Sequence, residues 1–181
     1  MKYDNDPRLI FSRKWFGIKG VKKEIATLAA GCFWGVEQIL RGIPGVLDTT
    51  VGYTGGILQY PTYEDICQGN TGHAEAIEVT FDPSKISYEE LLDTFFRLHD
   101  PTTKNRQGHD VGSQYRSAIF YHTEEQKEIA LKVKDRVNRS GKWEREVVTE
   151  IVPAGPFYPA EDYHQDYLQN NPGGYSCHYL R

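Results

Sequence analysis

The apolar residues between positions 24 and 152 alternate between two spacings, and this alternation restricts the fold more than any other feature of the chain. Segments with a spacing of two, or with a short continuous apolar run, predict strands. The segments with these patterns are 24–30, 46–53, 74–82, 116–122 and 146–152. Helical spacing predicts one helix after Gly31-Cys32 and two more that begin at Ser87 and Thr123.

Capping signals support the two later helices. Ser87 is followed by Glu90 and Thr123 by Gln126, which fits the capping-box pattern, and Gly141 is expected to end the last helix. The predicted order is β-α-β, β-α-β and then α-β. Because its first six elements match a split β-α-β plan, we predict an α+β two-layer sandwich with a ferredoxin-like core and long ordered loops.

Three long segments separate or follow these elements, at 54–73, 99–115 and 153–181. They are poor in aliphatic residues, and we interpret them as mostly irregular. Compact domains rarely contain structureless loops beyond about 15 residues unless the loops are functional. We therefore expect these segments to form the walls of a site.

The chain of 181 residues is expected to form a single catalytic domain, 1–181. Residues 1–22 are interpreted as a basic N-terminal extension. The net charge of −4 does not favour a nucleic-acid partner. With 39% hydrophobic and 25% charged residues, the composition excludes disordered, collagen-like and coiled-coil proteins.

The sequence contains no apolar run of about 18 residues and no apolar core of a signal peptide, so we expect no membrane partner. Its three cysteines are too few for a disulfide scaffold and favour a reducing, cytoplasmic location. In that setting a cysteine is either a buried apolar residue or a reactive group.

Cys32 is the best candidate for a reactive thiol. It lies where a strand of small residues turns into a helix, and the helix N-terminus favours a thiolate. The glycines Gly31 and Gly35 free the backbone, while Phe33 and Trp34 can form an apolar wall beside the sulfur. This arrangement fills a core poorly, which favours a functional role.

Five further sequence blocks accompany the block that contains Cys32. The first block is G-C-F-W-G at 31–35, and the others are P-T-Y-E-D-I-C at 61–67, T-G-H-A-E-A at 71–76, G-H-D-V-G-S-Q-Y-R-S-A-I at 108–119, A-E-D-Y-H-Q-D-Y-L at 160–168 and N-P-G-G-Y at 171–175. In this order they resemble the peptide methionine sulfoxide reductases of type A, over roughly residues 24–177. Several independent blocks make the resemblance specific.

The resemblance implies that a Cys32 thiolate attacks the sulfur of methionine S-sulfoxide. The leaving oxygen must then be protonated or hydrogen-bonded, and by family position this falls to Glu75, Tyr63 and Tyr115. A carboxyl group between apolar walls has a raised pKa and can act as an acid near neutrality.

The resemblance also implies the residues that bind the substrate. Phe33 and Trp34 would hold the S-methyl group, which lets only one sulfoxide epimer place its oxygen on the acid. Asp110 would contact the substrate backbone, and Tyr175 would close the pocket wall. His164 is expected to hydrogen-bond within its own block, 160–168, and to help shape the site.

The resemblance also implies how the oxidised Cys32 is returned to its reduced form. Cys32 would carry the oxygen as a sulfenic acid, which condenses with a nearby thiol to a disulfide. Cys177, in the C-terminal tail, is the best resolving candidate, and Cys67 is interpreted as structural or spare. Thioredoxin or another dithiol would reduce the disulfide, and the substrates would be oxidised proteins or free methionine sulfoxide. The sequence has no cofactor-binding signature, and we expect no cofactor and no metal.

Three alternatives remain open at this stage. A papain-like cysteine hydrolase would use Cys32 and His164, which are 132 residues apart, with Asn170 or Asn171. A thiol peroxidase or redox sensor would also use a reactive cysteine and a resolving thiol, but it does not explain the aromatic pair. A metal-binding domain is disfavoured, since the six histidines and three cysteines form no pair with metal-ligand spacing.

Overall fold

The computed structural model describes residue 20 and residues 22–181, so most of the predicted N-terminal extension lies outside the described residues. The strands are β1 (Glu24–Ala30), β2 (Val46–Thr54), β3 (Ala74–Phe81), β4 (Arg106–Gln107), β5 (Asp110–Val111), β6 (Ser117–Tyr121), β7 (Glu150–Pro153) and β8 (Phe157–Pro159). The α-helices are α1 (Phe33–Leu40), α2 (Tyr63–Cys67), α3 (Tyr88–Leu98), α4 (Glu124–Arg139) and α5 (Tyr167–Asn170). Two 3-10 helices are η3 (Ser113–Tyr115) and η4 (Asp162–His164).

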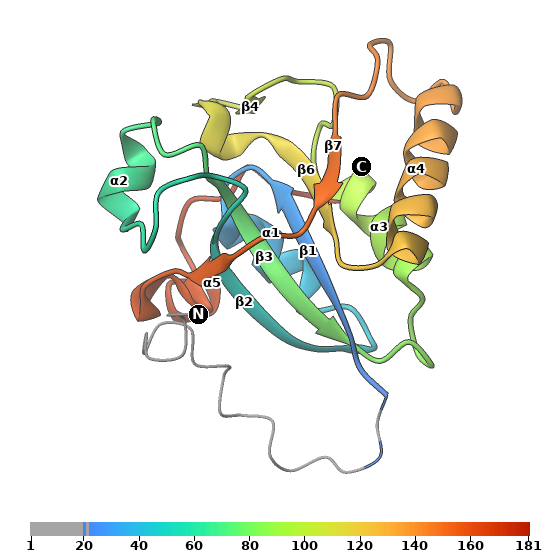
Figure 1. The fold of residues 1–181 in the computed structure, drawn as a ribbon, viewed down its shortest axis with the longest axis horizontal. Coiled ribbons are helices and arrows are strands. Elements are labelled where there is room, and N and C mark those ends of the chain that lie inside the picture. The colour runs from blue at the N-terminus through green and yellow to red at the C-terminus, as the bar shows by residue number, and fades with distance from the viewer. Residues whose placement is uncertain (1–19, 21) are drawn as a thin grey trace.

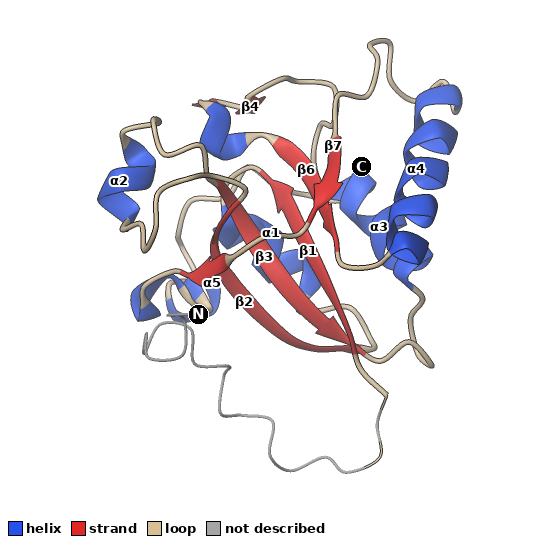
Figure 2. Cartoon of the chain, in the orientation of Figure 1, coloured by secondary structure: helices blue, strands red, loops and turns tan. Residues whose placement is uncertain are grey.

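One mixed sheet forms the centre of the molecule, with the strand order β7-β6-β1-β3-β2-β8 (Figure 2). Neighbouring strands are antiparallel except β6 and β7, which are parallel. The predicted α+β class is therefore confirmed. The five predicted strands are all present, although the last begins at Glu150 rather than at 146.

Helices α1, α3 and α4 cover one face of this sheet and enclose the larger core. Leu28, Ile77 and Phe81 contribute the sheet side of that core, and Leu91 and Phe95 of α3 pack onto it. The predicted N-caps are present, because Ser87 accepts a hydrogen bond from the Glu90 backbone and Thr123 accepts one from the Gln126 backbone. The capping box predicted at Thr123 is incomplete, because the Gln126 side chain accepts its hydrogen bond from the His122 backbone. Tertiary packing and local capping therefore select the same helices.

Small side chains on the opposite face let the chain cross close to the sheet. Ala29, Ala74, Ala76 and Ala118 form a buried cluster with Phe120. The segment that leads from β7 to β8 runs over this face (Figure 1), where Val152, Ala154 and Phe157 pack against the cluster. An alanine-rich surface buries a crossing segment without a second layer of helices.

Three of the predicted loops contain short elements that the apolar pattern does not reveal. Helix α2 lies within 54–73, strands β4 and β5 lie within 99–115, and β8, η4 and α5 lie within 153–181. Thr62 and Asp65 form a complete capping box at α2. These segments consequently contain more regular secondary structure than predicted.

Candidate active site

The chain turns sharply between β1 and α1, and Cys32 lies at this turn. Gly31 has φ +94°, which favours glycine, and Cys32 is the N-cap of α1. The Cys32 side chain is 7% exposed. Burial, followed by the charge of Glu75, raises the pKa of its thiol, although the Trp34 backbone N–H favours the thiolate. The expected thiolate is therefore not the resting form, since burial outweighs the helix N-terminus.

Glu75 projects from β3 on the face covered by helices. Ile77 and Phe81 lie in the core on that face, and alternate residues of a strand share a face. Glu75 pairs with Tyr53 across to β2 and is 3% exposed. Burial, and then the charge of Asp110, raises the pKa of its carboxyl well above the usual range. A neutral carboxylic acid thus lies in electrostatic range of the Cys32 sulfur.

Two tyrosines reach the same place from different elements. Tyr63 begins α2 and Tyr115 ends η3, and both side chains are half-buried. Burial raises the pKa of each phenol, and Glu75 raises both further. Tyr115 also interacts electrostatically with Cys32. Both hydroxyls are therefore neutral hydrogen-bond donors at physiological pH.

Aromatic rings surround the start of α1. Trp34 stacks on Tyr167 with ring centroids 3.8 Å apart, and Phe33 packs against Tyr53 at 5.8 Å. His164 is completely buried among these rings, and its Nδ1 accepts a hydrogen bond of 3.0 Å from Trp34 Nε1. The prediction that His164 bonds within its own block holds for its backbone, which donates a hydrogen bond of 2.9 Å to Glu161, whereas its ring bonds to Trp34 on α1. His164 fixes the indole of Trp34.

The C-terminal segment brings Cys177 to the same site. Tyr175 donates a hydrogen bond of 3.3 Å from its hydroxyl to Asp110, and Cys177 Sγ lies 3.9 Å from the same carboxyl oxygen. Cys177 is among the groups whose charge acts on the Cys32 thiol, so the two sulfurs lie within electrostatic range. The predicted resolving cysteine and nucleophile therefore occupy one region.

Cys67 lies closer to this region than its interpretation as a spare residue implies. It is exposed at the end of α2, and it raises the pKa of the Tyr63 hydroxyl after the larger effect of burial. Sequence reasoning missed this proximity because it treated 54–73 as a loop. A helix of five residues places positions 63 and 67 on one face, and the Thr62–Asp65 capping box was the signal that could have revealed it.

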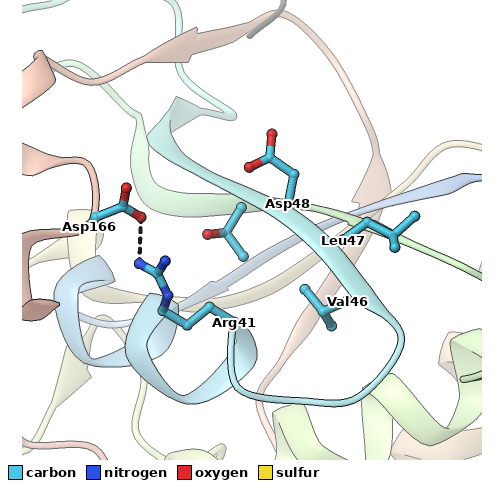
Figure 3. A pocket seen from close by; sticks show the side chains of 6 residues that line it. Arg41, Val46, Leu47, Asp48 and Asp166 are labelled. Atoms are coloured by element: carbon cyan, nitrogen blue, oxygen red, sulfur yellow. Dashed lines mark hydrogen bonds and ion pairs between the residues drawn. The ribbon is translucent and has the colours of Figure 1, made fainter. Parts of the chain in front are cut away.

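A second polar region lies near the C-terminal end of α1 (Figure 3). A cavity of about 100 Å³ is lined there by Arg41, Val46, Leu47, Asp48, Thr49 and Asp166, and Arg41 points toward Asp166. None of the residues that surround Cys32 lines it. This cavity is therefore separate from the candidate active site.

Two features of the described residues bear on alternative functions. Among residue 20 and residues 22–181, no group of three or more histidine, cysteine or acidic side chains is arranged to hold a metal ion. In the same part of the chain, no helix has the length and apolar character needed to span a membrane.

A buried thiol, a neutral acid and an aromatic wall at a strand-to-helix turn define a cysteine-dependent enzyme of the α+β class. The sequence profile described as peptide methionine sulfoxide reductase matches residues 24–181. The chain belongs to this family. It is 58% identical over 149 residues to peptide methionine sulfoxide reductase MsrA of Methanothermobacter thermautotrophicus, covering 82% of this chain and 88% of the relative.

Solved structures agree with this assignment. The reduced form of Mxr1 from Saccharomyces cerevisiae superposes with a TM-score of 0.83 at 41% identity, covering 90% of this chain and 97% of that one. Mxr1 in complex with Trx2 superposes with a TM-score of 0.62 at 32% identity, covering 93% of this chain and 96% of that one. Family membership selects the reductase hypothesis over the hydrolase, peroxidase and metal-binding alternatives.

Proposed function

We propose that this protein reduces methionine S-sulfoxide, free or in proteins, to methionine, with Cys32 as the nucleophile and Glu75 as the acid. The observation that carries the proposal is the buried Cys32 thiol within electrostatic range of a buried carboxyl whose pKa is raised by burial. The family assignment supplies the substrate class. The protein thus acts in repair after oxidation.

In the first step the Cys32 sulfur attacks the sulfoxide sulfur, and the S–O bond of the substrate breaks. The transient bond between the two sulfurs then breaks as the oxygen passes to Cys32, so methionine is reduced and released and Cys32 is oxidised to a sulfenic acid. Glu75 gives its proton to this oxygen, and the thiol proton of Cys32 restores the acid, so that one hydrogen remains on the sulfenic acid. The neutral hydroxyls of Tyr63 and Tyr115 are further donors to it.

Selectivity for one epimer follows from the two unlike walls of the site. Trp34, held by His164 and stacked on Tyr167, offers an apolar surface for the S-methyl group, together with Phe33. Glu75 offers a donor for the oxygen. The mirror-image sulfoxide cannot place both groups at once. Asp110 and Tyr175, which are hydrogen-bonded to each other, are suited to hold the substrate backbone.

In the second stage the Cys177 thiol attacks the sulfenic acid, which yields a Cys32–Cys177 disulfide and water. Thioredoxin then reduces this disulfide. The solved complex of the related Mxr1 with Trx2 supports a thioredoxin partner. The reaction requires neither a metal nor an organic cofactor.

We further infer that residues 24–181 form one catalytic domain, preceded by the basic extension, with a C-terminal tail that carries the resolving cysteine. The family profile spans this range. The strand order β6-β1-β3-β2, with helices between β1 and β2 and between β3 and β6, supports the ferredoxin-like core. The three free thiols favour the reducing cytoplasm.

Single turnover without reductant tests the proposal. Purified protein is mixed with methionine S-sulfoxide, and methionine is quantified. We expect one equivalent from the parent and from Cys177→Ser, and none from Cys32→Ser. With thioredoxin present, Cys177→Ser should stop after that equivalent, whereas the control Cys67→Ser should continue. Turnover by Cys32→Ser would refute the nucleophile, and sustained thioredoxin-dependent cycling by Cys177→Ser would refute the resolving cysteine.

A further inference from the structure

The residues that follow Cys177 are anchored next to the nucleophile. His178 lies with its Nε2 atom 2.6 Å from the carbonyl oxygen of Ala30, the last residue of β1. Three residues later, the Arg181 backbone donates a hydrogen bond of 2.8 Å to Arg97 of α3. The C-terminus accordingly lies beside α3 (Figure 1). These bonds hold the His178 imidazole at a defined place relative to the turn that carries Cys32.

Gly35 makes this close approach possible. A Cβ atom at position 35 would lie 2.5 Å from His178 Nδ1 and 2.5 Å from Ser176 Oγ. Gly35 lies within α1 and has no positive φ, so the contact rather than the backbone conformation requires glycine. The imidazole therefore packs directly on the first turn of α1, next to Cys32.

The hydrogen bond to Ala30 determines which nitrogen of His178 can accept a proton. A carbonyl oxygen only accepts, so Nε2 carries the hydrogen, and Nδ1 of the neutral ring has a free lone pair. Cys177 Sγ lies 3.7 Å from Nδ1. Burial lowers the pKa of His178, which keeps the ring neutral near pH 7. The Cys177 thiol can therefore donate to Nδ1.

We propose that His178 is a catalytic residue of the second step, in which its Nδ1 takes the proton from Cys177 while the Cys177 sulfur attacks the sulfenic acid on Cys32. The S–S bond forms and the S–O bond of Cys32 breaks. The departing oxygen carries its own hydrogen and gains one proton, returned from the imidazolium, and leaves as water. Cys177 is oxidised and the Cys32 sulfenic acid is reduced. This role rests on the proposed function of Cys32 and Cys177.

Asp110 also contacts the Cys177 sulfur, at 3.9 Å, but it is less suited to this role. A carboxylate is a weaker base than an imidazole, and proton transfer to it leaves no positive charge beside the new thiolate. Burial raises the pKa of Cys177, and the Asp110 charge adds to this effect. Transfer to His178 instead creates an imidazolium next to the thiolate, which stabilises it.

The pH dependence of the proton transfer from Cys177 to His178 is also affected by the charged and titratable groups around His178. These are Arg181 and Asp110, which act on its pKa, Cys177, which it contacts, and His99, whose pKa it helps to lower. None of them is changed by a substitution at 178. His178→Gln is the informative variant, since the amide nitrogen of glutamine can still donate to Ala30 while no base remains at Nδ1.

The experiment separates the two chemical steps in a Cys67→Ser background. Each protein is mixed rapidly with methionine S-sulfoxide in the absence of reductant. Released methionine reports the first step, and dimedone trapping of Cys32 with mass spectrometry reports the decay of the sulfenic acid. The proteins compared are the parent, His178→Gln, His178→Ala, Asp110→Asn and Cys177→Ser.

For His178→Gln we expect methionine release within about twofold of the parent and decay of the sulfenic acid about 10²-fold slower at pH 7. Its decay should accelerate about tenfold per pH unit up to pH 9, because hydroxide replaces the lost base. Imidazole in the buffer should partly restore decay in His178→Ala. Full-rate decay in His178→Gln, an equal defect at every pH, or the pH-dependent defect in Asp110→Asn instead would overturn the proposal.

The same data show whether the role of His178 fails or whether the proposed function itself fails. If the parent releases no methionine, the reductase assignment fails. If the trapped acid decays as fast in Cys177→Ser as in the parent, Cys177 is not the resolving residue. In either case the role of His178 falls with the assignment on which it rests.

Discussion

Two carboxyl groups, Glu37 on α1 and Glu75 on β3, are equally inaccessible but differ in their partners. They are 1% and 3% exposed, and burial raises the pKa of both. Glu37 accepts hydrogen bonds of 3.0 Å from Thr49 Oγ1 and 2.7 Å from the Asp166 backbone. For Glu75, the influences on the pKa are burial and the charge of Asp110, and both raise it. The two carboxyls are therefore distinguished by the groups around them and not by burial.

The charges around the two groups differ in the same way. Glu37 lies beside the Arg41–Asp166 ion pair of Figure 3, where the Asp166 charge raises its pKa and the Arg41 charge lowers it. Glu75 instead faces Asp110, and both burial and this charge favour its neutral form. Hydrogen bonds and Arg41 thus oppose the rise in the Glu37 pKa, whereas burial and the Asp110 charge act together to raise the Glu75 pKa.

The largest predicted effect is on the rate of the first step. Glu75→Gln should slow methionine release in single turnover by about 10²-fold or more, because the variant loses its general acid. The matched variant Glu37→Gln should stay within about twofold of the parent, since its amide can replace both hydrogen bonds. Equal effects of the two substitutions would remove the distinction between these carboxyls.

The second prediction concerns stability and pH. Burial raises the pKa of Glu37 to about 7 from 4.5, so the folded protein binds more protons than the unfolded chain between these values. Stability is therefore lost as pH rises through this window, by about 3 kcal/mol in total. In urea unfolding from pH 4.5 to 7, Glu37→Gln should remove this part of the decline.

Glu75 also causes the stability to fall as the pH rises, because its pKa is also raised in the folded protein. Its window begins at the same unfolded value and extends to higher pH. Glu75→Gln should consequently flatten the stability profile and increase stability at pH 8 relative to the parent. A profile of Glu75→Gln that parallels the parent would show that this carboxyl is not held in its neutral form.

A smaller effect is expected when one donor to Glu37 is removed. Thr49→Val keeps the shape of the side chain and eliminates its hydrogen bond to Glu37, so unfolding free energy at pH 7 should fall by about 1 kcal/mol. Methionine release should not change. A slower first step in this variant would connect the Glu37 region to catalysis.

The smallest effect is predicted for the ion pair at the cavity. Arg41 and Asp166 have side chains that are 27% and 32% exposed, so solvent screens their attraction. Arg41→Met should lower the free energy of unfolding by about 0.5 kcal/mol, and added salt should lessen the difference. A loss of several kcal/mol, independent of salt, would mean that this pair is essential to the packing of α1.

The sequence predicted the elements whose signals are local. Strand β1 matches the apolar run 24–30, and α3 and α4 begin after the predicted caps Ser87 and Thr123. Strand β8 was not predicted, because it has only three residues and its extended conformation depends on pairing with Gly52–Thr54 of β2. Helix α2 was not predicted, because the glycine, proline and asparagine residues around it favoured a loop despite the Thr62 capping signal.

At the site, too, features with a local sequence signal were predicted, whereas features that depend on distant contacts were not. The strand-to-helix turn predicted Cys32, motif position predicted Glu75 and the place in the C-terminal tail predicted Cys177, and the structure gathers them in one region. The direction of the Cys32 pKa could not be predicted, because burial by distant segments opposes the helix N-terminus. His178 went unnoticed because its importance depends on contacts with Ala30 and Gly35, about 150 residues away in sequence.

The central claim is that the Cys32 sulfur takes the oxygen from one epimer of methionine sulfoxide. The most direct measurement supplies each epimer separately to the Cys177→Ser variant and maps the transferred oxygen by mass spectrometry. We predict one equivalent of methionine and one oxygen atom on Cys32 with the S-epimer, and neither with the R-epimer. Oxygen on Cys67, or equal reaction of both epimers, would contradict the account.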